Sequence, residues 1–257
     1  MLDYSLEGKT YLVIGASSGI GRASAIAISR LGGRVVLSSR DESKLQETLS
    51  LMDNADKHII MSYDMCNLKG ITEFIKNCIN KMNTKFDGLV FCAGSAGTRL
   101  IKMEQLDEFE EGFLLGYKSY LEILKSFSSK RVMNDGGSIV ALSSRAALFP
   151  EKAMTRYATT KAAINVTSKI AAQEFAKRKI RVNTICPEMT KTPMVNHFFD
   201  NVTEEQLNKF YPLGFLEPND VADLVIFLLS DMSKKLTGQN FYLSAGNAGT
   251  PIENYIV

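Results

Sequence analysis

Hydrophobic and polar positions form two kinds of segment along the chain: short runs rich in Val, Ile and Leu, and longer stretches with helical spacing. The short runs predict strands at Thr10–Ile14, Arg34–Ser39, His58–Tyr63, Leu89–Cys92, Ser138–Ser143, Arg181–Ile185 and Gln239–Leu243. The longer stretches predict helices at Ile20–Leu31, Ser43–Leu51, Leu68–Met82, Leu106–Ser129, Met154–Lys177 and Pro218–Ser230. The two kinds alternate, which is typical of a sheet whose strands are connected by helices.

The expected strands are apolar throughout, which indicates burial on both faces, as in a parallel sheet. Alternating strands and helices favour right-handed strand–helix–strand units. The sequence has neither an internal repeat nor a low-complexity linker, so we expect one doubly wound α/β domain over residues 1–257. Segment 187–215 shows neither pattern, and loops of that length are usually functional. It is interpreted as a mobile substrate flap.

Composition narrows the class of protein. Apolar residues make up 45% and charged residues 23%, an ordinary balance for a soluble domain. The net charge is +2, with both signs interspersed, which argues against a nucleic-acid partner. Met1–Lys9 lacks the pattern of a signal peptide, and no stretch approaches the roughly 18 apolar residues of a membrane span. We therefore expect a cytoplasmic protein without a membrane partner.

Cysteine and histidine give no sign of a metal site. The 4 cysteines include no Cys-x-x-Cys pair and are interpreted as reduced thiols. The 2 histidines, His58 and His197, are too few for a His-rich site, so no metal is expected. A Ser-His-Asp triad would need one of them, and neither has a suggestive context.

A glycine-rich turn follows the first expected strand and leads into a helix. Its glycines allow a tight bend and close approach of a pyrophosphate, and the N–H groups at the helix start favour an anion. The alternative is a turn without a ligand, but the strand before it, the helix after it and a second strand about 20 residues on favour a dinucleotide. The candidate cofactor-binding residues of this turn are Gly15, Ser17, Ser18, Gly19, Ile20 and Gly21.

The end of the second expected strand predicts the type of dinucleotide. Ser39 and Arg40 stand where an acidic residue would hold the ribose 2′-hydroxyl of NAD. Arg40 can instead pair with a 2′-phosphate, which favours NADP(H). The alternative is a surface arginine paired with Asp41 or Glu42. Arg22 could add positive charge nearby or lie in solvent.

Tyr157 and Lys161 are four positions apart in an expected helix, so they share one face. An unperturbed tyrosine has a pKa of about 10, and a neighbouring ammonium would lower it. This makes Tyr157 a candidate general acid or base. Ser144 ends an expected strand, where ligands bind in such sheets, and its hydroxyl could hold a substrate carbonyl oxygen.

In this order the motifs resemble the classical short-chain dehydrogenase/reductase family, from about Glu7 to Gly246, and its 3-oxoacyl-acyl-carrier-protein reductase branch in particular. Matching features are Gly15-x-x-x-Gly19-x-Gly21, Asp64, Ala93-Gly94, Ser144, Tyr157-x-x-x-Lys161, Arg181-Val182-Asn183-x-Ile185-Cys186-Pro187, Thr192-Pro193-Met194 and Leu236-Thr237-Gly238. The resemblance implies a Rossmann-type domain with seven parallel strands, and a homotetramer or homodimer.

The resemblance also implies roles for matching positions. Tyr157 would be the acid or base, Lys161 would lower its pKa and bind the nicotinamide ribose, and Ser144 would orient the substrate oxygen. Further cofactor contacts are implied for Asp64 and Met65 near adenine, for Ala93 and Gly94 along the cofactor, and for Pro187, Met189 and Thr192 near the nicotinamide carboxamide.

Four positions depart from the family pattern. Ile14 replaces the usual Thr before the first glycine, and Phe91-Cys92 replaces the usual Asn-Asn. Glu188 replaces the usual Gly after Pro187, and Gly116 replaces an Asn that helps to hold a water relay to the lysine. Loss of the relay would slow proton resupply.

Three functions are compatible with these residues. The first is an NADP(H)-dependent oxidoreductase that acts on a 3-oxoacyl thioester or another ketone or secondary alcohol. The second is a keto-sugar or secondary-metabolite reductase. The third is a weakly catalytic NADP(H)-binding sensor or structural subunit, and Gly116 is the observation that suggests it. Flap aromatics Phe198-Phe199, Phe210 and Tyr211 could line an apolar substrate pocket or pack against another subunit.

Overall fold

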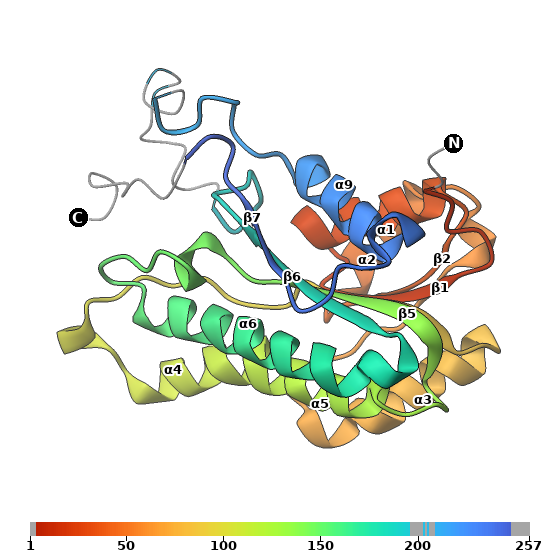
Figure 1. The fold of residues 1–257 in the computed structure, drawn as a ribbon. Helices are drawn as coiled ribbons and strands as arrows, with labels where there is room; N and C mark the ends of the chain where they lie inside the picture. The colour runs from red at the N-terminus through yellow and green to blue at the C-terminus, as the bar shows by residue number, and fades with distance from the viewer. Residues whose placement is uncertain (1–3, 196–202, 204, 206–208, 248–257) are drawn as a thin grey trace.

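A sheet of seven parallel strands, in the order β3-β2-β1-β4-β5-β6-β7, lies at the centre of the molecule (Figure 1). The structure is a computed structural model that describes residues 4–195, 203, 205 and 209–247. The strands are β1 Thr10–Ile14, β2 Arg34–Ser38, β3 Ile59–Ile60, β4 Phe86–Phe91, β5 Met133–Leu142, β6 Arg181–Pro187 and β7 Asn240–Leu243. The expected α/β fold class is confirmed.

Helices cover both faces of the sheet, with α1, α2 and α9 on one face and α3, α4, α5 and α6 on the other (Figure 1). Their bounds are α1 Gly19–Arg30, α2 Glu42–Ser50, α3 Ile71–Met82, α4 Leu106–Phe113, α5 Ser119–Phe127, α6 Thr155–Phe175 and α9 Pro218–Leu229. Short 3-10 helices lie at Ala55–Lys57, Leu68–Gly70, Ile101–Met103, Arg145–Ala147, Ala176–Arg178 and Asp231–Ser233.

Each face of the sheet has its own hydrophobic core because successive strand residues point to opposite faces. In β1, Leu12 and Ile14 pack into the core beneath α3, α5 and α6. Their neighbours Tyr11 and Val13 pack into the core beneath α1 and α9. All four side chains are 2% exposed or less, which explains why the strand is apolar at every position.

The expected helix 106–129 is divided by a π-helical segment, Leu114–Lys118, between α4 and α5. Gly116 lies within this segment, and a Cβ placed on it would lie 2.6 Å from Cγ2 of Thr160 in α6. The missing side chain therefore lets the widened turn approach α6 closely. The expected third strand, 58–63, is shorter than predicted and consists of β3 alone.

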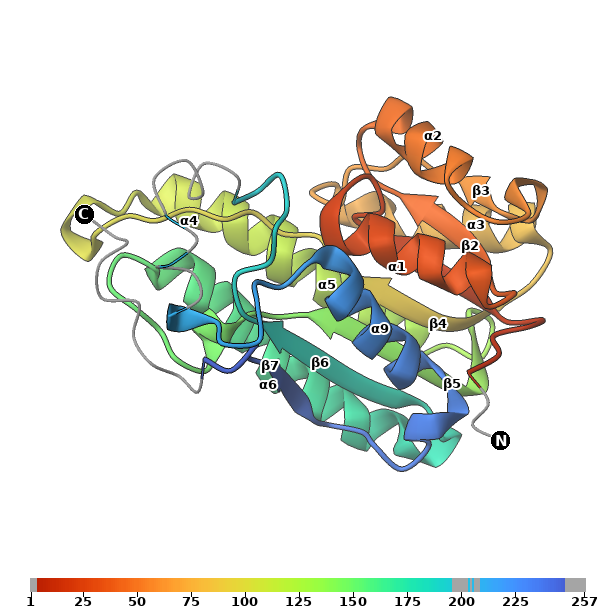
Figure 2. The ribbon, with the colours of Figure 1, turned by 90° about the horizontal axis from the view of Figure 1, so that it is seen from above.

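Strand order reverses between β1 and β4, which creates a crevice at the carboxyl ends of the strands. β1 pairs with β2 on one side and with β4 on the other, so the chain leaves β1 and β4 in opposite directions. Figure 2 shows α1 near β2 and β4, away from β6 and β7. Among the described residues, none of the helices has the length and apolar character that crossing a membrane requires.

Candidate active site

A cavity of about 740 Å³ opens at the carboxyl ends of the strands. Its walls come from the turn after β1, from the ends of β2, β4, β5 and β6, and from the start of α6. This volume lies in the upper part of the range for small-molecule sites. The cavity therefore lies at the point of strand reversal, where such sheets bind ligands.

The glycine turn between β1 and α1 forms one wall of the cavity. Gly15 and Gly19 have positive φ angles of +83° and +51°, a region that side chains other than glycine rarely adopt. A Cβ on Gly21 would overlap the carbonyl oxygen of Gly15, and one on Gly15 would lie 3.1 Å from the backbone carbon of Cys92. The turn is thus closed tightly on itself, with the first N–H groups of α1 beside it. This cradle fits a dinucleotide pyrophosphate.

Basic side chains lie at the end of β2. Arg40 is exposed and lines the cavity together with Lys44. Asp41, the alternative partner for Arg40, instead pairs with Lys44 at 3.6 Å and caps α2 by accepting the Lys44 N–H. Arg22 makes contacts within the protein: its guanidinium pairs with Glu47 at 3.0 Å and donates a hydrogen bond to the Ser17 carbonyl.

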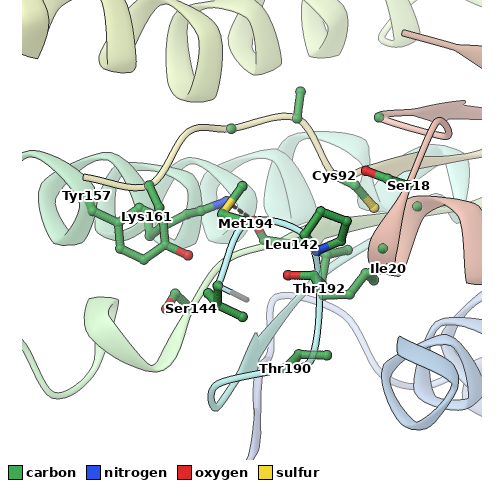
Figure 3. A pocket seen from close by; sticks show the side chains of 18 of the residues that line it. Ser18, Ile20, Cys92, Leu142, Ser144, Tyr157, Lys161, Thr190, Thr192 and Met194 are labelled. Atoms are coloured by element: carbon green, nitrogen blue, oxygen red, sulfur yellow. Dashed lines mark hydrogen bonds between the residues drawn. The ribbon is translucent and has the colours of Figure 1, made fainter. Parts of the chain in front are cut away.

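Ser144, Tyr157 and Lys161 face the same part of the cavity (Figure 3). Ser144 follows β5 and caps the 3-10 helix Arg145–Ala147, with its Oγ accepting the Ala146 N–H. Tyr157 and Lys161 are one turn apart in α6, and Lys161 Nζ lies 5.8 Å from the centre of the Tyr157 ring. Ser143 Oγ donates to the Lys161 carbonyl at 3.0 Å, which fixes α6 against the end of β5.

The protonation states of these groups differ from the sequence-based expectation. The pKa of Tyr157 is raised, because burial of the phenol outweighs the opposing hydrogen bond with Ser144. Lys161 donates to the Leu142 carbonyl at 2.7 Å, and burial lowers its pKa to about 8. The expected lowering of the Tyr157 pKa by Lys161 is therefore wrong for this structure, since desolvation is the larger effect on both groups.

The structure brings together all the predicted site residues except Asp64. The lining residues that the sequence predicted are Gly15, Ser17, Ser18, Gly19, Ile20, Gly21, Ser39, Arg40, Met65, Ala93, Gly94, Ser144, Tyr157, Lys161, Pro187, Met189 and Thr192. Asp64 is exposed, and its carboxylate accepts the Cys66 N–H at 3.0 Å. It thus caps a local turn and does not line the cavity.

The described part of the flap reaches back to the glycine turn. A Cβ on Gly19 would lie 3.0 Å from Thr192 Cγ2, so the two segments touch across the cavity. Tyr211 does not line the cavity as one interpretation suggested, because it is 2% exposed in a small core with Leu216 and Ala245, against which Phe210 packs. Phe198 and Phe199 lie outside the described residues.

Cys92 and Cys186 are packed groups. Burial raises the pKa of Cys92 to about 12 and also raises that of Cys186. Both thiols therefore stay protonated near neutral pH and serve as small packing groups rather than nucleophiles. Phe91, beside Cys92, is fully buried, and its ring lies 5.0 Å from that of Tyr120.

Besides Asp41 and Lys44, the charged lining residues that the sequence-based prediction did not assign to the site are Arg145, Glu151 and Glu188. Arg145 Nε lies 2.8 Å from Glu188 Oε1, and Arg145 Nη1 lies 2.7 Å from Glu151 Oε1. The one available signal was Glu188 itself, an acidic residue directly after a buried strand. Its partner Arg145 is far away in sequence, so only the fold reveals the contact.

Comparisons with known proteins agree with this geometry. A family model described as enoyl-(acyl carrier protein) reductase matches residues 15–248. The 3-oxoacyl-(acyl-carrier-protein) reductase FabG of Rickettsia conorii is 33% identical over 248 residues, 96% of this chain and 98% of its own. Senescence-associated protein 13 of Arabidopsis thaliana is 29% identical and covers 95% of this chain and 91% of its own. A short-chain type dehydrogenase/reductase from Mycobacterium ulcerans superposes with a TM-score of 0.87 at 28% identity, over 95% of this chain and 90% of its own.

Proposed function

The chain belongs to the short-chain dehydrogenase/reductase family, whose members use a nicotinamide cofactor, and we propose that it is an NADP(H)-dependent oxidoreductase acting on a carbonyl or secondary alcohol. The observation that carries this proposal is the meeting of Ser144, Tyr157 and Lys161 in one cavity with the glycine turn.

Residues along the cavity would hold NADP(H) in an extended form. The glycine turn and the start of α1 would bind the pyrophosphate, and Arg40 would pair with the 2′-phosphate. Lys161 would bind the nicotinamide ribose, and Pro187, Met189 and Thr192 would contact the carboxamide. The nicotinamide supplies or accepts the hydride, and the protein binds and orients the reactants.

Tyr157 would exchange a proton with the substrate oxygen, while Ser144 holds that oxygen. Because burial raises the pKa of Tyr157, the phenol is protonated near neutral pH and is ready to donate. A protonated donor suits reduction of a carbonyl to an alcohol, in which the oxygen gains a proton as the carbon gains hydride. In the reverse reaction the same group would accept the proton from the alcohol.

The substrate we favour is a 3-oxoacyl thioester or another ketone, since relatives such as the Rickettsia conorii protein are named 3-oxoacyl reductases. A keto-sugar or secondary-metabolite reductase is the alternative with the same chemistry. From the family resemblance the protein is proposed to act as a homotetramer or homodimer, and its reduced thiols favour the cytoplasm.

The test is NADPH oxidation by Tyr157→Phe with a panel of ketones and 3-oxoacyl thioesters. We expect kcat to fall by about 10²–10⁴-fold, because the proton donor is lost, while NADPH binding is retained. Tyr4→Phe, at an exposed position, is the matched control and should behave as the unmodified protein. If both the unmodified protein and Tyr157→Phe bind NADPH tightly and neither turns over any substrate, the result would instead support an NADP(H)-binding sensor, the function that Gly116 suggests.

A further inference from the structure

Ser143 is a buried residue that lies between the end of β5 and Ser144, and the sheet fixes its backbone. The residue is 3% exposed. Its N–H donates to the Ile185 carbonyl of β6 at 2.8 Å, so the hydrogen bonding between these strands continues one residue past the end of β5. The side chain of Ser143 therefore starts from a rigid part of the backbone.

Two consecutive residues at this end of β5 hold Lys161 at two points. Ser143 Oγ donates to the Lys161 carbonyl at 3.0 Å, and Lys161 Nζ donates to the Leu142 carbonyl at 2.7 Å. The backbone of Lys161 and the tip of its side chain are thus both attached to the same strand end. We call Leu142, Ser143 and Lys161 the strand–helix clamp.

The clamp lies in the middle of a row of polar contacts along α6. Tyr157, Lys161 and Asn165 follow one another at four-residue spacing, so they share one face of the helix. One turn before the clamp, Tyr157 is hydrogen-bonded to the Ser144 side chain. One turn after it, Asn165 Oδ1 accepts the hydroxyl of Thr184 in β6 at 2.9 Å. The position of α6 along the sheet therefore decides where Tyr157 meets Ser144.

A hydrogen bond fixes this position in a way that apolar packing does not. Apolar contacts are non-directional, so a helix can slide a little over a sheet without losing them. A hydrogen bond is limited in both length and angle. Catalytic groups require such accuracy, because a displacement of about 1 Å can cost about 10²-fold in rate.

We propose that Ser143 is a positioning residue, whose hydroxyl fixes α6 against β5 so that Tyr157 and Lys161 are aligned with the reactants. This inference rests on the proposed function, because it concerns proton transfer in the same site. Ser143 acts through Lys161 and its helix, not by contact with the substrate oxygen.

Ser138, a residue of β5, provides a matched control. It is 1% exposed, and its Oγ donates to the Leu228 carbonyl of α9 at 2.7 Å. Ser138→Ala removes the same kind of buried contact, a serine hydroxyl on a helix carbonyl, but on the other face of the sheet and away from the cavity. We expect Ser143→Ala and Ser138→Ala to lower Tm to a similar extent.

Steady-state oxidation of NADPH, with the best ketone or thioester of the panel, tests the proposal. In Ser143→Ala we expect kcat to fall about tenfold or more, with both KM values changed less than about threefold, because binding is retained and alignment is lost. Ser138→Ala should keep the original kcat. The Lys161 carbonyl still accepts the N–H four residues on, so Ser143→Ala is compatible with folding.

Ser143→Cys is the second variant, with a thiol of similar shape and weaker donor strength. It should lower kcat in the same direction, and it decides the question if Ser143→Ala does not fold.

The pKa of Lys161 gives a second readout, which needs no turnover. Burial lowers this pKa to about 8, and the ionisable groups around the ammonium are Cys92, Cys186 and Tyr157. The pH dependence of Lys161 acetylation, followed by mass spectrometry, measures the pKa in each variant. In Ser143→Ala water should reach Nζ more easily, so the pKa should rise by about one pH unit or more, whereas Ser138→Ala should leave it unchanged.

Equal values of kcat in Ser143→Ala and Ser138→Ala would overturn the proposal and make Ser143 a structural residue only. A loss of activity that appears in KM alone would overturn it as well. If the unmodified protein turns over no compound of the panel, the proposed function fails. The Lys161 pKa then decides by itself whether Ser143 positions α6, and an equal pKa in both alanine variants would show that it does not.

Discussion

At the scale of single residues, burial governs the chemistry of the cavity. Tyr157 and Lys161 are both shifted towards their neutral forms, the phenol by a raised pKa and the ammonium by a pKa lowered to about 8. Desolvation disfavours whichever form is charged, so one cause moves the two groups in opposite directions. Tyr157 is therefore a proton donor at neutral pH.

Arg40 determines cofactor preference in the proposed function. Arg40→Ala should raise the KM for NADPH by about tenfold or more, because a charge-assisted contact to the 2′-phosphate is lost. The KM for NADH should change little, since NADH has no such phosphate. Steady-state kinetics with both cofactors measures the effect. An unchanged ratio of the two KM values would show that Arg40 is only a surface residue.

His58 makes the stability of the fold depend on pH. Its Nδ1 accepts the Val35 N–H at 3.1 Å and Nε2 lies 2.8 Å from the Asp53 carbonyl, which fits a neutral ring that donates through Nε2. Burial lowers the pKa of His58 in the folded state. In the unfolded chain the pKa is about 6.5, so below that pH the unfolded state binds the extra proton.

We therefore expect the free energy of unfolding to fall as the pH drops from about 6.5 towards the lowered pKa of folded His58, by up to about 1.4 kcal/mol per pH unit. Urea unfolding between pH 5 and 8 measures this slope. His58→Gln should be less stable at pH 8 and should have a smaller slope. A slope identical to that of the unmodified protein would assign the titration to other groups.

The sequence predicted the site residues that lie close to one another along the chain. The four-residue spacing of Tyr157 and Lys161 and the glycine turn fix their own geometry, whatever the rest of the fold does. Arg145 and Glu188 were missed, because their contact depends on how two strand ends lie side by side. Asp64 does not line the cavity, and its carboxylate accepts the neighbouring Cys66 N–H, so its place near adenine stays a prediction.

At the scale of elements, the π-helical segment Leu114–Lys118 between α4 and α5 contains Gly116, where the family pattern has Asn. Gly116 lies against Thr160, whose hydroxyl donates to the Arg156 carbonyl and so holds its methyl group in place. The sequence predicted one helix here, with glycines interrupting it. A change of helix type was beyond prediction, because it depends on the packing against α6.

Gly116→Asn, which restores the usual family residue, should destabilise the fold by about 1–3 kcal/mol, since the new Cβ would lie 2.6 Å from Thr160 Cγ2. Thr160→Ser removes that methyl and keeps the hydroxyl, so the double variant should recover much of the loss. Urea unfolding of both single variants and the double variant measures the coupling. Additive effects would contradict a direct clash.

At the scale of the whole molecule, the cavity joins segments from the two halves of the chain. Gly19 belongs to the first helix and Thr192 to the segment after β6, yet the two meet across the site. The alternating pattern predicted the parallel sheet and its layers, because each strand is apolar on both faces. It did not predict that the flap and the glycine turn touch.

A ligand that contacts both halves should stabilise the whole fold. NADPH at about 100 times its Kd should add about 2.7 kcal/mol to the free energy of unfolding, which corresponds to a rise in Tm of about 5–10 °C. Differential scanning fluorimetry measures the shift, with NADH at the same concentration as the control. Equal shifts with NADPH and NADH would contradict the proposed 2′-phosphate contact.

The pairing of Arg145 with Glu188 also makes the two positions unequal in their effect on stability. Without the Glu188 carboxylate, Arg145 still has Glu151 as a partner. Without Arg145, the buried carboxylate of Glu188 loses its cation, which is strongly destabilising. Substitution of Arg145 by an uncharged residue should therefore lower the free energy of unfolding more than substitution of Glu188 does.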